Sequence, residues 1–341
     1  MNAATGDAYW VRFQKVIEHI DDHLAEDLNV HSLSGVAAFS KHHFHRQFSA
    51  LFGIGVHKYV QLVRFKRASY QLAFRTDRRI IDIALDSRYE SHEAFSRAFK
   101  KVVGQTPSEF REQPQWDPWH AAFQRVTRIR SLNMKVEELA ESVRIVDFEE
   151  TRVAALEHRG DPKRLGDSVR SFITWRKQNN LPPAKSATFN ILYDDPADTA
   201  PQDYRFDICA AINRSVASND FGIVEKVIPK GRCAALRHVG SDDTLAAAIN
   251  YLYATWYPAS GEELRDFPLS LQRIRFFPEV PEHEAVADIF LPLAGRAGAR
   301  AGLVARLSST REVSDSQHFM REKRYARTIL SCANASEHPK G

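Results

Sequence analysis

Apolar side chains recur at helical spacing through the first third of the chain. Residues 11–25 carry them on one stripe, and residues 56–74 form a long run with an apolar face and a basic face. Shorter runs of the same kind lie before, between and after these two. The pattern predicts an all-α region of seven helices, at about 11–25, 30–38, 40–53, 56–74, 80–85, 91–104 and from Pro107 onward.

Two of these helices repeat each other 51 residues apart. The stretches SKHHFHRQFSALFG (40–53) and SHEAFSRAFKKVVG (91–104) share Ser, Phe, Arg, Phe and Gly at matching positions. The Ser is a good N-cap, the two Phe share one helix face, and the Gly marks the C-terminal end. The Arg lies about 160° around the helix from either Phe and points outward. The repeat predicts a pair of helix-turn-helix units. The matched pairs are Ser40/Ser91, Phe44/Phe95, Arg46/Arg97, Phe48/Phe99 and Gly53/Gly104.

Charge is distributed unevenly along the chain. Residues 36–111 carry 14 Lys and Arg against 6 Asp and Glu, whereas residues 131–295 carry 19 against 25. A basic segment joined to an acidic one fits a polyanion-binding module with a partner domain. The alternative is that the basic stretch is only a solvated surface.

Residues 11–111 resemble the DNA-binding domain of the AraC/XylS family of bacterial transcription regulators, and the resemblance covers the spacer helix in register. In the turn of each unit the family usually has Gly where this chain has Ala38 and Arg88. If these turns need a positive φ, each substitution costs about 1 kcal/mol or somewhat more. The residues that carry the resemblance are Leu33, Phe39, Ser40, Phe44, Arg46, Phe48, Gly53, Ile83, Ala84, Tyr89, Ser91, Phe95, Arg97, Phe99, Gly104, Pro107 and Phe110.

The resemblance implies that each recognition helix enters a major groove of double-stranded DNA, the two grooves lying about 34 Å apart. Arg46 and Arg97 can bond to guanine O6 and N7, and Glu93 can accept from cytosine N4. The base-facing candidates are His42, His45, Arg46, His92, Glu93, Ser96 and Arg97. Phosphate contacts are expected from Ser40, Lys41, Lys100 and Lys101.

Two other interpretations of the first recognition helix stay open. Arg46 could be a surface cation with no DNA role. The cluster of His42, His43 and His45 could be a metal site, although no Cys or carboxylate lies nearby in sequence. We expect neither a metal nor a cofactor.

After residue 142 the periodicity changes to that of strands and helices in alternation. Residues 153–160 (VAALEHRG) match 233–240 (CAALRHVG) at an offset of 80, and a helical run ending at Trp175 or Trp256 follows each copy. The domain is therefore predicted to be α+β, built from two pseudo-symmetric strand–helix–strand–strand repeats with a cleft between them. Predicted strands cover 143–148, 152–157, 188–193, 205–213 and 231–238, and predicted helices 165–178 and 244–257.

Residues 143–295 resemble the GyrI-like (gyrase-inhibitory-protein-like) effector-binding domain. The resemblance rests on ALEHRG (155–160), YDDP (193–196), RFDIC (205–209), IPKGR (228–232), WYPASG (256–261) and DIFLPL (288–293). It implies a small-molecule receptor, with Trp175, Tyr193, Tyr251 and Trp256 as pocket aromatics or, alternatively, as core residues. Many members carry a buried Glu that attracts cationic ligands, where this chain has Gln272. A neutral or weakly polar ligand, or a vestigial pocket, is therefore expected.

The predicted domain division is 1–113 for the DNA-binding domain, 114–142 for a linker that is partly docked and partly helical, 143–295 for the GyrI-like domain and 296–341 for a flexible basic tail. The composition, with 43% hydrophobic and 26% charged residues, is that of an ordinary soluble protein, and no apolar run approaches the roughly 18 residues that span a bilayer. We expect no signal peptide, because the N-terminus has no cationic region followed by an apolar core, and we expect a cytoplasmic location from this and from the cysteines. The three cysteines, Cys209, Cys233 and Cys332, form no CxxC pair and argue against a disulfide framework.

The function expected from the sequence is sequence-specific, ligand-responsive regulation of transcription, without enzymatic activity. A bound ligand would bias how the recognition helices sit or how the protein contacts RNA polymerase. Two alternatives are a hydrolase of small electrophiles, for which Gln272 cannot act as general base, and a non-specific DNA-binding or gyrase-interacting protein.

Overall fold

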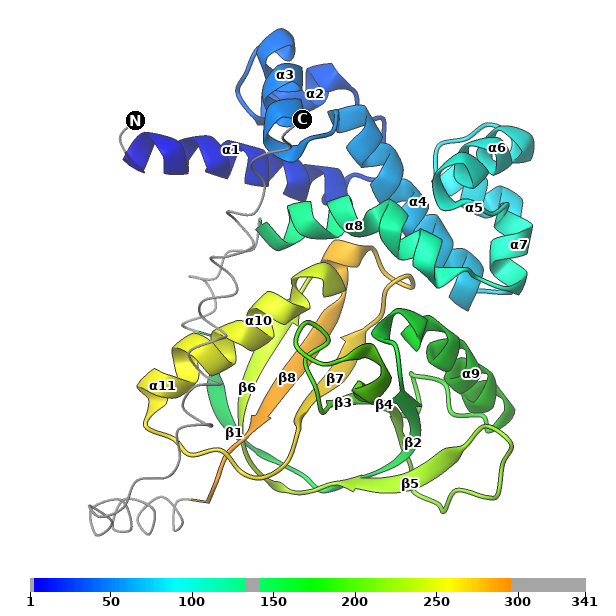
Figure 1. The fold of residues 1–341 in the computed structure, drawn as a ribbon, viewed down its shortest axis with the longest axis vertical. Helices are drawn as coiled ribbons and strands as arrows, with labels where there is room; N and C mark the ends of the chain where they lie inside the picture. Colours follow the sequence, from blue (N-terminus) through cyan, green and yellow to red (C-terminus); the bar gives the residue numbers. More distant parts are fainter. Residues whose placement is uncertain (1–2, 133–141, 296–341) are drawn as a thin grey trace, which may run out of the picture.

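The computed structural model describes residues 3–132 and 142–295. The first range is all-α and the second combines helices with one antiparallel sheet (Figure 1). This confirms the fold class predicted from the sequence. The helices of the first range are α1 (Ala3–Asp22), α2 (Val30–Val36), α3 (Lys41–Phe52), α4 (Val56–Phe74), α5 (Ile80–Asp86), α6 (His92–Val103), α7 (Pro107–Glu112) and α8 (Trp116–Leu132).

The spacer helix α4 joins two similar groups of helices, α1–α3 and α5–α7, which we call the first and second units. Its Tyr59 packs 5.8 Å from Phe48 of α3, between ring centroids, and its Phe65 packs 5.7 Å from Phe99 of α6. All four side chains are fully buried. One helix therefore supplies an aromatic anchor to each unit, and the two units share a single core.

Helix α8 extends the helical core beyond the two units. It is a continuous helix within residues 114–142, the segment predicted to be a linker, partly docked and partly helical. Pro118 falls in the first turn, where its missing N–H costs no helical hydrogen bond. The core-facing side chains of α8 belong to the same core as the two units, so the helical domain extends to residue 132. They are Trp116, Trp119, Phe123, Val126 and Ile129.

The second range forms an eight-stranded sheet in the order β1-β6-β8-β7-β3-β4-β2-β5. Three of its strands, β5, β7 and β8, were not among the predicted strands. The elements are β1 (Arg144–Phe148), β2 (Thr151–Arg159), α9 (Leu165–Gln178), β3 (Thr188–Leu192), β4 (Arg205–Ala211), β5 (Ile223–Ile228), β6 (Gly231–Val239), α10 (Leu245–Tyr251), a π-helical turn (Leu252–Trp256), α11 (Tyr257–Ser260), β7 (Leu269–Arg275) and β8 (Val286–Pro292).

The predicted internal repeat is confirmed. Repeat 1 is β2–α9–β3–β4 and repeat 2 is β6–α10–β7–β8, and the two lie side by side through the pairing of β3 with β7. Each edge strand pairs with one repeat and continues along the chain into the other. Strand β1 pairs with β6 of repeat 2 and is followed by β2 of repeat 1, and β5 pairs with β2 of repeat 1 and is followed by β6 of repeat 2. These connections tie the two repeats together.

Helices α9 and α10 cover the same face of the sheet, and each has its own core with the strands of its repeat. A third cluster lies on the opposite face. No described helix is both long and apolar enough to cross a membrane. Cys332 and the predicted tail, 296–341, lie outside the described residues, as do residues 133–141 of the predicted linker.

Candidate nucleic-acid interface and ligand site

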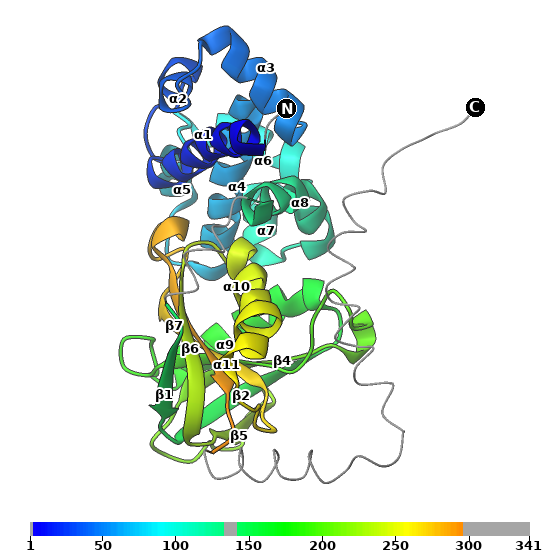
Figure 2. The same ribbon diagram turned by 90° about the vertical axis from the view of Figure 1, so that its left-hand side faces the viewer.

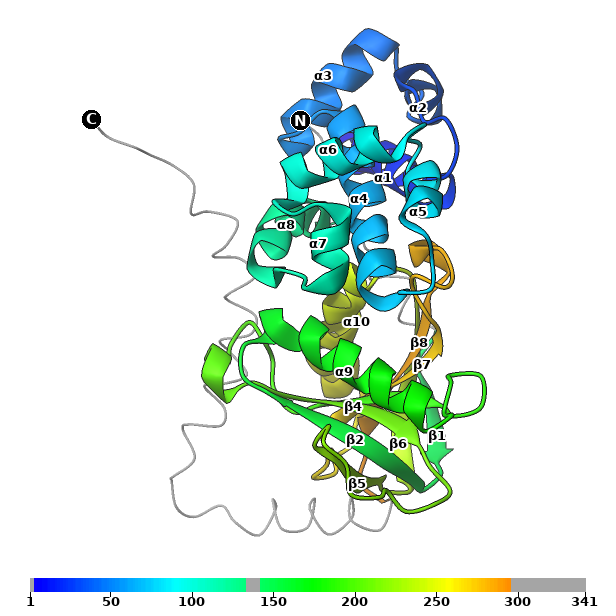
Figure 3. The ribbon, with the colours of Figure 1, turned by 90° about the vertical axis from the view of Figure 1, so that its right-hand side faces the viewer.

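The two predicted recognition helices lie on the same side of the helical domain. Figures 2 and 3, which view the molecule from opposite sides, both place α3 and α6 toward one flank and α2 and α5 toward the other. Such an arrangement allows both helices to approach one DNA duplex.

The caps of the two helices follow the repeat in the sequence. The Ser40 hydroxyl accepts from the His43 N–H at 3.4 Å, and the Ser91 hydroxyl accepts from the Ala94 N–H at 3.1 Å. At the other end, Gly53 and Gly104 have φ of 67° and 87°, the left-handed conformation that ends a helix. The repeated Ser and Gly therefore set the length of each helix.

The turns that precede the recognition helices carry backbone strain. Ala38 has φ of 51° and Arg88 has φ of 67°, at the positions where the family usually has Gly. A side chain in this conformation clashes with its own backbone. Both turns do adopt a positive φ, so Ala38 and Arg88 each lower the stability of the domain.

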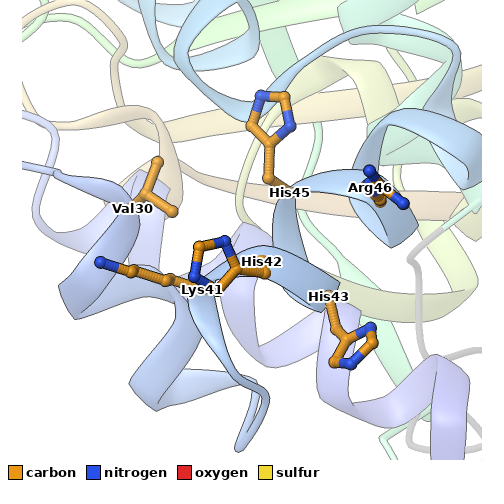
Figure 4. A pocket seen from close by; sticks show the side chains of 6 residues that line it. All are labelled: Val30, Lys41, His42, His43, His45 and Arg46. Atoms are coloured by element: carbon orange, nitrogen blue, oxygen red, sulfur yellow. The ribbon is translucent and has the colours of Figure 1, made fainter.

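The first recognition helix presents a cationic, histidine-rich surface. Ser40, Lys41, His42, His45 and Arg46 are all exposed. Within the described chain the Arg46 guanidinium has no ion pair or hydrogen bond, so it is available to a ligand. Figure 4 shows the side chains that line an open recess of about 610 Å³ here, namely Val30, Lys41, His42, His43, His45 and Arg46.

The metal interpretation finds no support in this geometry. In Figure 4 the rings of His43 and His45 point away from each other. Among residues 3–132 and 142–295, no three His, Cys, Asp or Glu side chains gather as metal ligands.

The second recognition helix presents a different set of side chains. Glu93, Arg97, Lys100 and Lys101 are exposed, whereas His92 and Ser96 are half-buried. The Ser96 hydroxyl is covered and has no hydrogen-bond partner among the described residues, so contact with a base requires it to rotate outward.

The position of Glu93 in the first turn of α6 favours the ionised form of its carboxyl group. Its own backbone N–H and then the Ser91 hydroxyl lower the pKa of its carboxyl group. Arg97, one turn further on, contributes in the same direction. Glu93 is therefore ionised at neutral pH and can only accept hydrogen bonds.

Two basic residues outside the recognition helices were missed from the sequence. Arg125 of α8 donates to the carbonyl of Gly53 at 2.9 Å and so holds the C-terminal end of α3. Lys58 of α4 lies near Lys101, and burial followed by that neighbouring charge lowers the pKa of Lys58. No local pattern indicates these contacts, because each joins two helices distant in the sequence.

The five predicted ligand residues do not meet in one place. Trp175 of α9 is buried in the core of repeat 1, Tyr251 of α10 is buried in the core of repeat 2, and Trp256 is partly buried against that second core. Gln272 pairs across strands with Phe189 on the opposite face of the sheet, where Tyr193 also packs. Their role in ligand binding stays a prediction.

A buried carboxylate does lie on that opposite face, at Asp207 of β4. Its carboxylate is fully buried and accepts hydrogen bonds from the Lys226 ammonium at 2.6 Å, the Arg159 guanidinium at 3.1 Å and the Tyr193 hydroxyl at 2.9 Å. Burial, then the hydrogen bond to Asp207, raises the pKa of Tyr193. Lys226 and Arg159 also pair with Glu157, so two cations balance two carboxylates in this cluster and Asp207 is not free to attract a cationic ligand.

Comparison with known proteins adds a family to each domain. A helix-turn-helix domain matches residues 33–113, and a GyrI-like small molecule binding domain matches residues 141–294. The C-terminal domain is 39% identical over 153 residues to the probable transcriptional regulator YgiV of Escherichia coli (strain K12), covering 45% of this chain and 96% of YgiV.

The helical domain has relatives of its own. It is 44% identical over 98 residues to the uncharacterized HTH-type transcriptional regulator YbfP of Bacillus subtilis (strain 168), covering 29% of this chain and 33% of YbfP. It is 35% identical over 97 residues to the right origin-binding protein of Escherichia coli (strain K12), covering 28% of this chain and 33% of that protein.

Proposed function

The chain belongs to the AraC-type helix-turn-helix transcriptional regulators that carry a C-terminal GyrI-like domain, and we propose that it binds specific DNA sequences through α3 and α6. The observation that carries the proposal is the matched pair Arg46 and Arg97. Both guanidinium groups are exposed and unpaired within the described residues, on equivalent turns of two helices that lie on one side of the domain. Arginine is the side chain most often used to identify guanine in the major groove.

The side chains around each arginine support reading of bases over simple attachment to phosphate. Non-specific binding needs only cations, yet α6 places the carboxylate of Glu93 at its tip, where it would repel a phosphate. The same group can accept from a cytosine amino group. Lys41, Lys100 and Lys101 then supply the contacts that position each helix.

Selection of bound fragments from a random DNA pool tests this function with the full chain. We expect the selected sequence to bind at least about a thousandfold more tightly than a scrambled one at the same salt concentration. A ratio near one would leave a DNA-binding protein without sequence preference and would refute the proposal.

We also propose that a neutral or weakly polar small molecule binds the GyrI-like domain and modulates DNA binding, directly or through contact with RNA polymerase. The match to a small molecule binding domain and the pseudo-symmetric repeats support a receptor role. Gln272 offers only neutral hydrogen bonds, and Asp207 is already neutralised by Lys226 and Arg159. No carboxylate at either position remains to attract a cation.

Ligand charge can be tested with two probes of similar shape, neutral triphenylphosphine oxide and the methyltriphenylphosphonium cation. The wild-type protein should bind the neutral probe more tightly, whereas Gln272→Glu should reverse the order, because the new carboxylate attracts the cation. Tighter binding of the cation by the wild-type protein would contradict a neutral ligand.

A further inference from the structure

The two domains meet through loops that occupy equivalent places in the two repeats. In repeat 1 the loop after Gly160 forms a short turn at Pro162–Arg164, and in repeat 2 the loop after Gly240 forms one at Asp242–Thr244. His158 donates to the Asp161 carbonyl and His238 to the Ser241 carbonyl, which explains why this histidine is common to both copies. Both loops contact α8, and Figure 1 shows α8 between the first unit and the sheet.

Repeat 2 holds the first unit and the spacer helix through a buried cluster of charges. Arg130 of α8 bonds Glu282 at 2.5 Å and Asp243 at 3.3 Å in repeat 2, and Asp21 of α1 at 2.6 Å. Lys66 of α4 bonds the same Asp243 and Glu282. Arg130 and Lys66 are each only 3% exposed, so solvent screens these bonds weakly.

Four members of this cluster keep one another charged, whereas at Asp21 burial outweighs Arg130 and raises the pKa of the carboxyl group. Burial alone would raise the pKa of Asp243 and Glu282, but Lys66 and Arg130 lower both below their usual values. Burial alone would likewise lower the pKa of Lys66, but the carboxylates of Glu282 and Asp243 raise it. Removal of one member would leave the others buried and unpaired, which is costly.

Repeat 1 holds the second unit by hydrogen bonds. Arg170 of α9 donates to the carbonyls of Arg111 and Glu112, at the C-terminal end of α7, both at 3.0 Å. The Trp116 indole N–H donates to Asp167 at 2.8 Å. The Trp116 ring also packs on Gly166 so closely that a Cβ there would lie 2.4 Å from a ring carbon.

Helix α8 contacts both repeats, one at each of its ends. Its N-terminal end meets repeat 1 through Trp116, and its C-terminal end meets repeat 2 through Arg130, about 21 Å further along at 1.5 Å per residue. Between them, Arg125 holds the end of α3 through the Gly53 carbonyl. A shift of one repeat relative to the other therefore displaces one end of α8, and the core that α8 shares with both units must deform for the spacing of α3 and α6 to change.

We infer that each repeat of the GyrI-like domain holds one helix-turn-helix unit, so that the relative position of the repeats sets the spacing of the two recognition helices on DNA. A ligand that changes the angle between the repeats would then change which spacing of half-elements the protein accepts. This inference rests on the proposed function, because it requires that both helices read DNA.

The test measures how strictly the full chain requires one spacing between the two half-elements of its selected DNA. Two variants loosen one attachment each. Arg130→Gln removes the cation that joins repeat 2 to α1. Gly166→Ala places a methyl group against the ring of Trp116, the residue through which α8 is attached to repeat 1. Arg128→Gln is the control for the first, since Arg128 is exposed on the same helix. Gly35→Ala is the control for the second, since its added methyl meets nothing within 4 Å.

A one-base-pair insertion between the half-elements should lower the affinity of the wild-type protein and both controls at least about tenfold. The same insertion should cost Arg130→Gln and Gly166→Ala about threefold or less, because the weakened attachment no longer holds the shared core of the two units at one spacing. Arg170→Gln, with exposed Lys177→Gln as its control, provides a third variant if either of the others fails to fold.

Equal discrimination against the insertion by the wild-type protein and every folded variant would overturn the inference, as would the absence of any spacing requirement in the wild-type protein. Failure of the proposed function is a separate result, since it would appear as the lack of a preferred sequence in the initial selection.

Discussion

The two helix-turn-helix units have the same framework and present different chemistry. Each has a Ser cap, two buried Phe, a left-handed Gly and a strained turn at the same positions. On the outer face, the first unit offers His42, His45 and Arg46, whereas the second offers Glu93 and Arg97. The difference indicates that the repeated residues maintain the helices, and we expect the residues that differ to contact different bases.

The buried Phe pairs should be the most sensitive part of this shared framework. Phe48→Ala and Phe99→Ala each remove a fully buried ring, and each should lower the free energy of unfolding by about 3–5 kcal/mol. Because the two units share one core, the whole helical domain should unfold in one transition in both variants. Denaturant unfolding followed by circular dichroism measures the loss, and unfolding of the helical domain in two steps, besides the transition of the GyrI-like domain, would show that the units are independent.

The two arginines should matter for DNA binding and not for stability. Arg46→Ala and Arg97→Ala should each weaken binding to the selected sequence by about 1–3 kcal/mol, because each loses a bidentate bond to a base. Binding titrations at fixed salt check this, with Arg128→Ala as an exposed arginine on neither recognition helix. An equal loss on selected and scrambled DNA would assign both side chains to phosphates.

Loss of an N-cap should lower the stability of the protein by a smaller amount, and the amount should differ between the two units. Replacement of Ser91 by Ala should cost about 1 kcal/mol of stability, and replacement of Ser40 somewhat less, because its hydrogen bond is longer, at 3.4 Å against 3.1 Å. Thermal unfolding without DNA measures both changes. A larger loss at Ser40 would contradict the order given by the two distances.

Relief of the strained turns should give the smallest change, and it should be a gain. Arg88→Gly and Ala38→Gly each remove a left-handed side-chain clash worth roughly 1–2 kcal/mol, offset in part by the greater freedom of Gly in the unfolded chain. A net stabilisation of about 0.5 kcal/mol is expected in each unit, read as a rise in the melting temperature. A loss of stability at Arg88 would show that its side chain makes a contact that outweighs the strain.

The sequence predicted the helices of the N-terminal domain more completely than the contacts that attach this domain to the GyrI-like domain. Residues such as Ser91, Phe95 and Gly104 act within one helix, so their spacing reveals their role, and α4 was predicted with its observed bounds. The segment that holds α8 was predicted to be a linker, partly docked and partly helical, without its bounds or its contacts. Its true role depends on contacts with residues more than 100 positions away, such as Asp243.

The candidate ligand site was harder to predict for a related reason. Trp175 and Tyr251 were identified by their place in the repeat, but a repeat position does not reveal which face of the sheet a residue covers. Asp207 lies within a motif that was noticed, yet its burial depends on Lys226 and Arg159 from two other strands. Pairings between distant strands leave no local pattern.

The central claim, that α3 and α6 each read bases in neighbouring grooves, is tested most directly by a base-by-base substitution scan of the selected DNA. Affinities would be measured for the wild-type protein, Arg46→Ala and Arg97→Ala. The account predicts two clusters of sensitive positions, about 10–10.5 base pairs apart, with one cluster lost in each variant. Loss of the same cluster in both variants, or uniform weakening at every position, would contradict it.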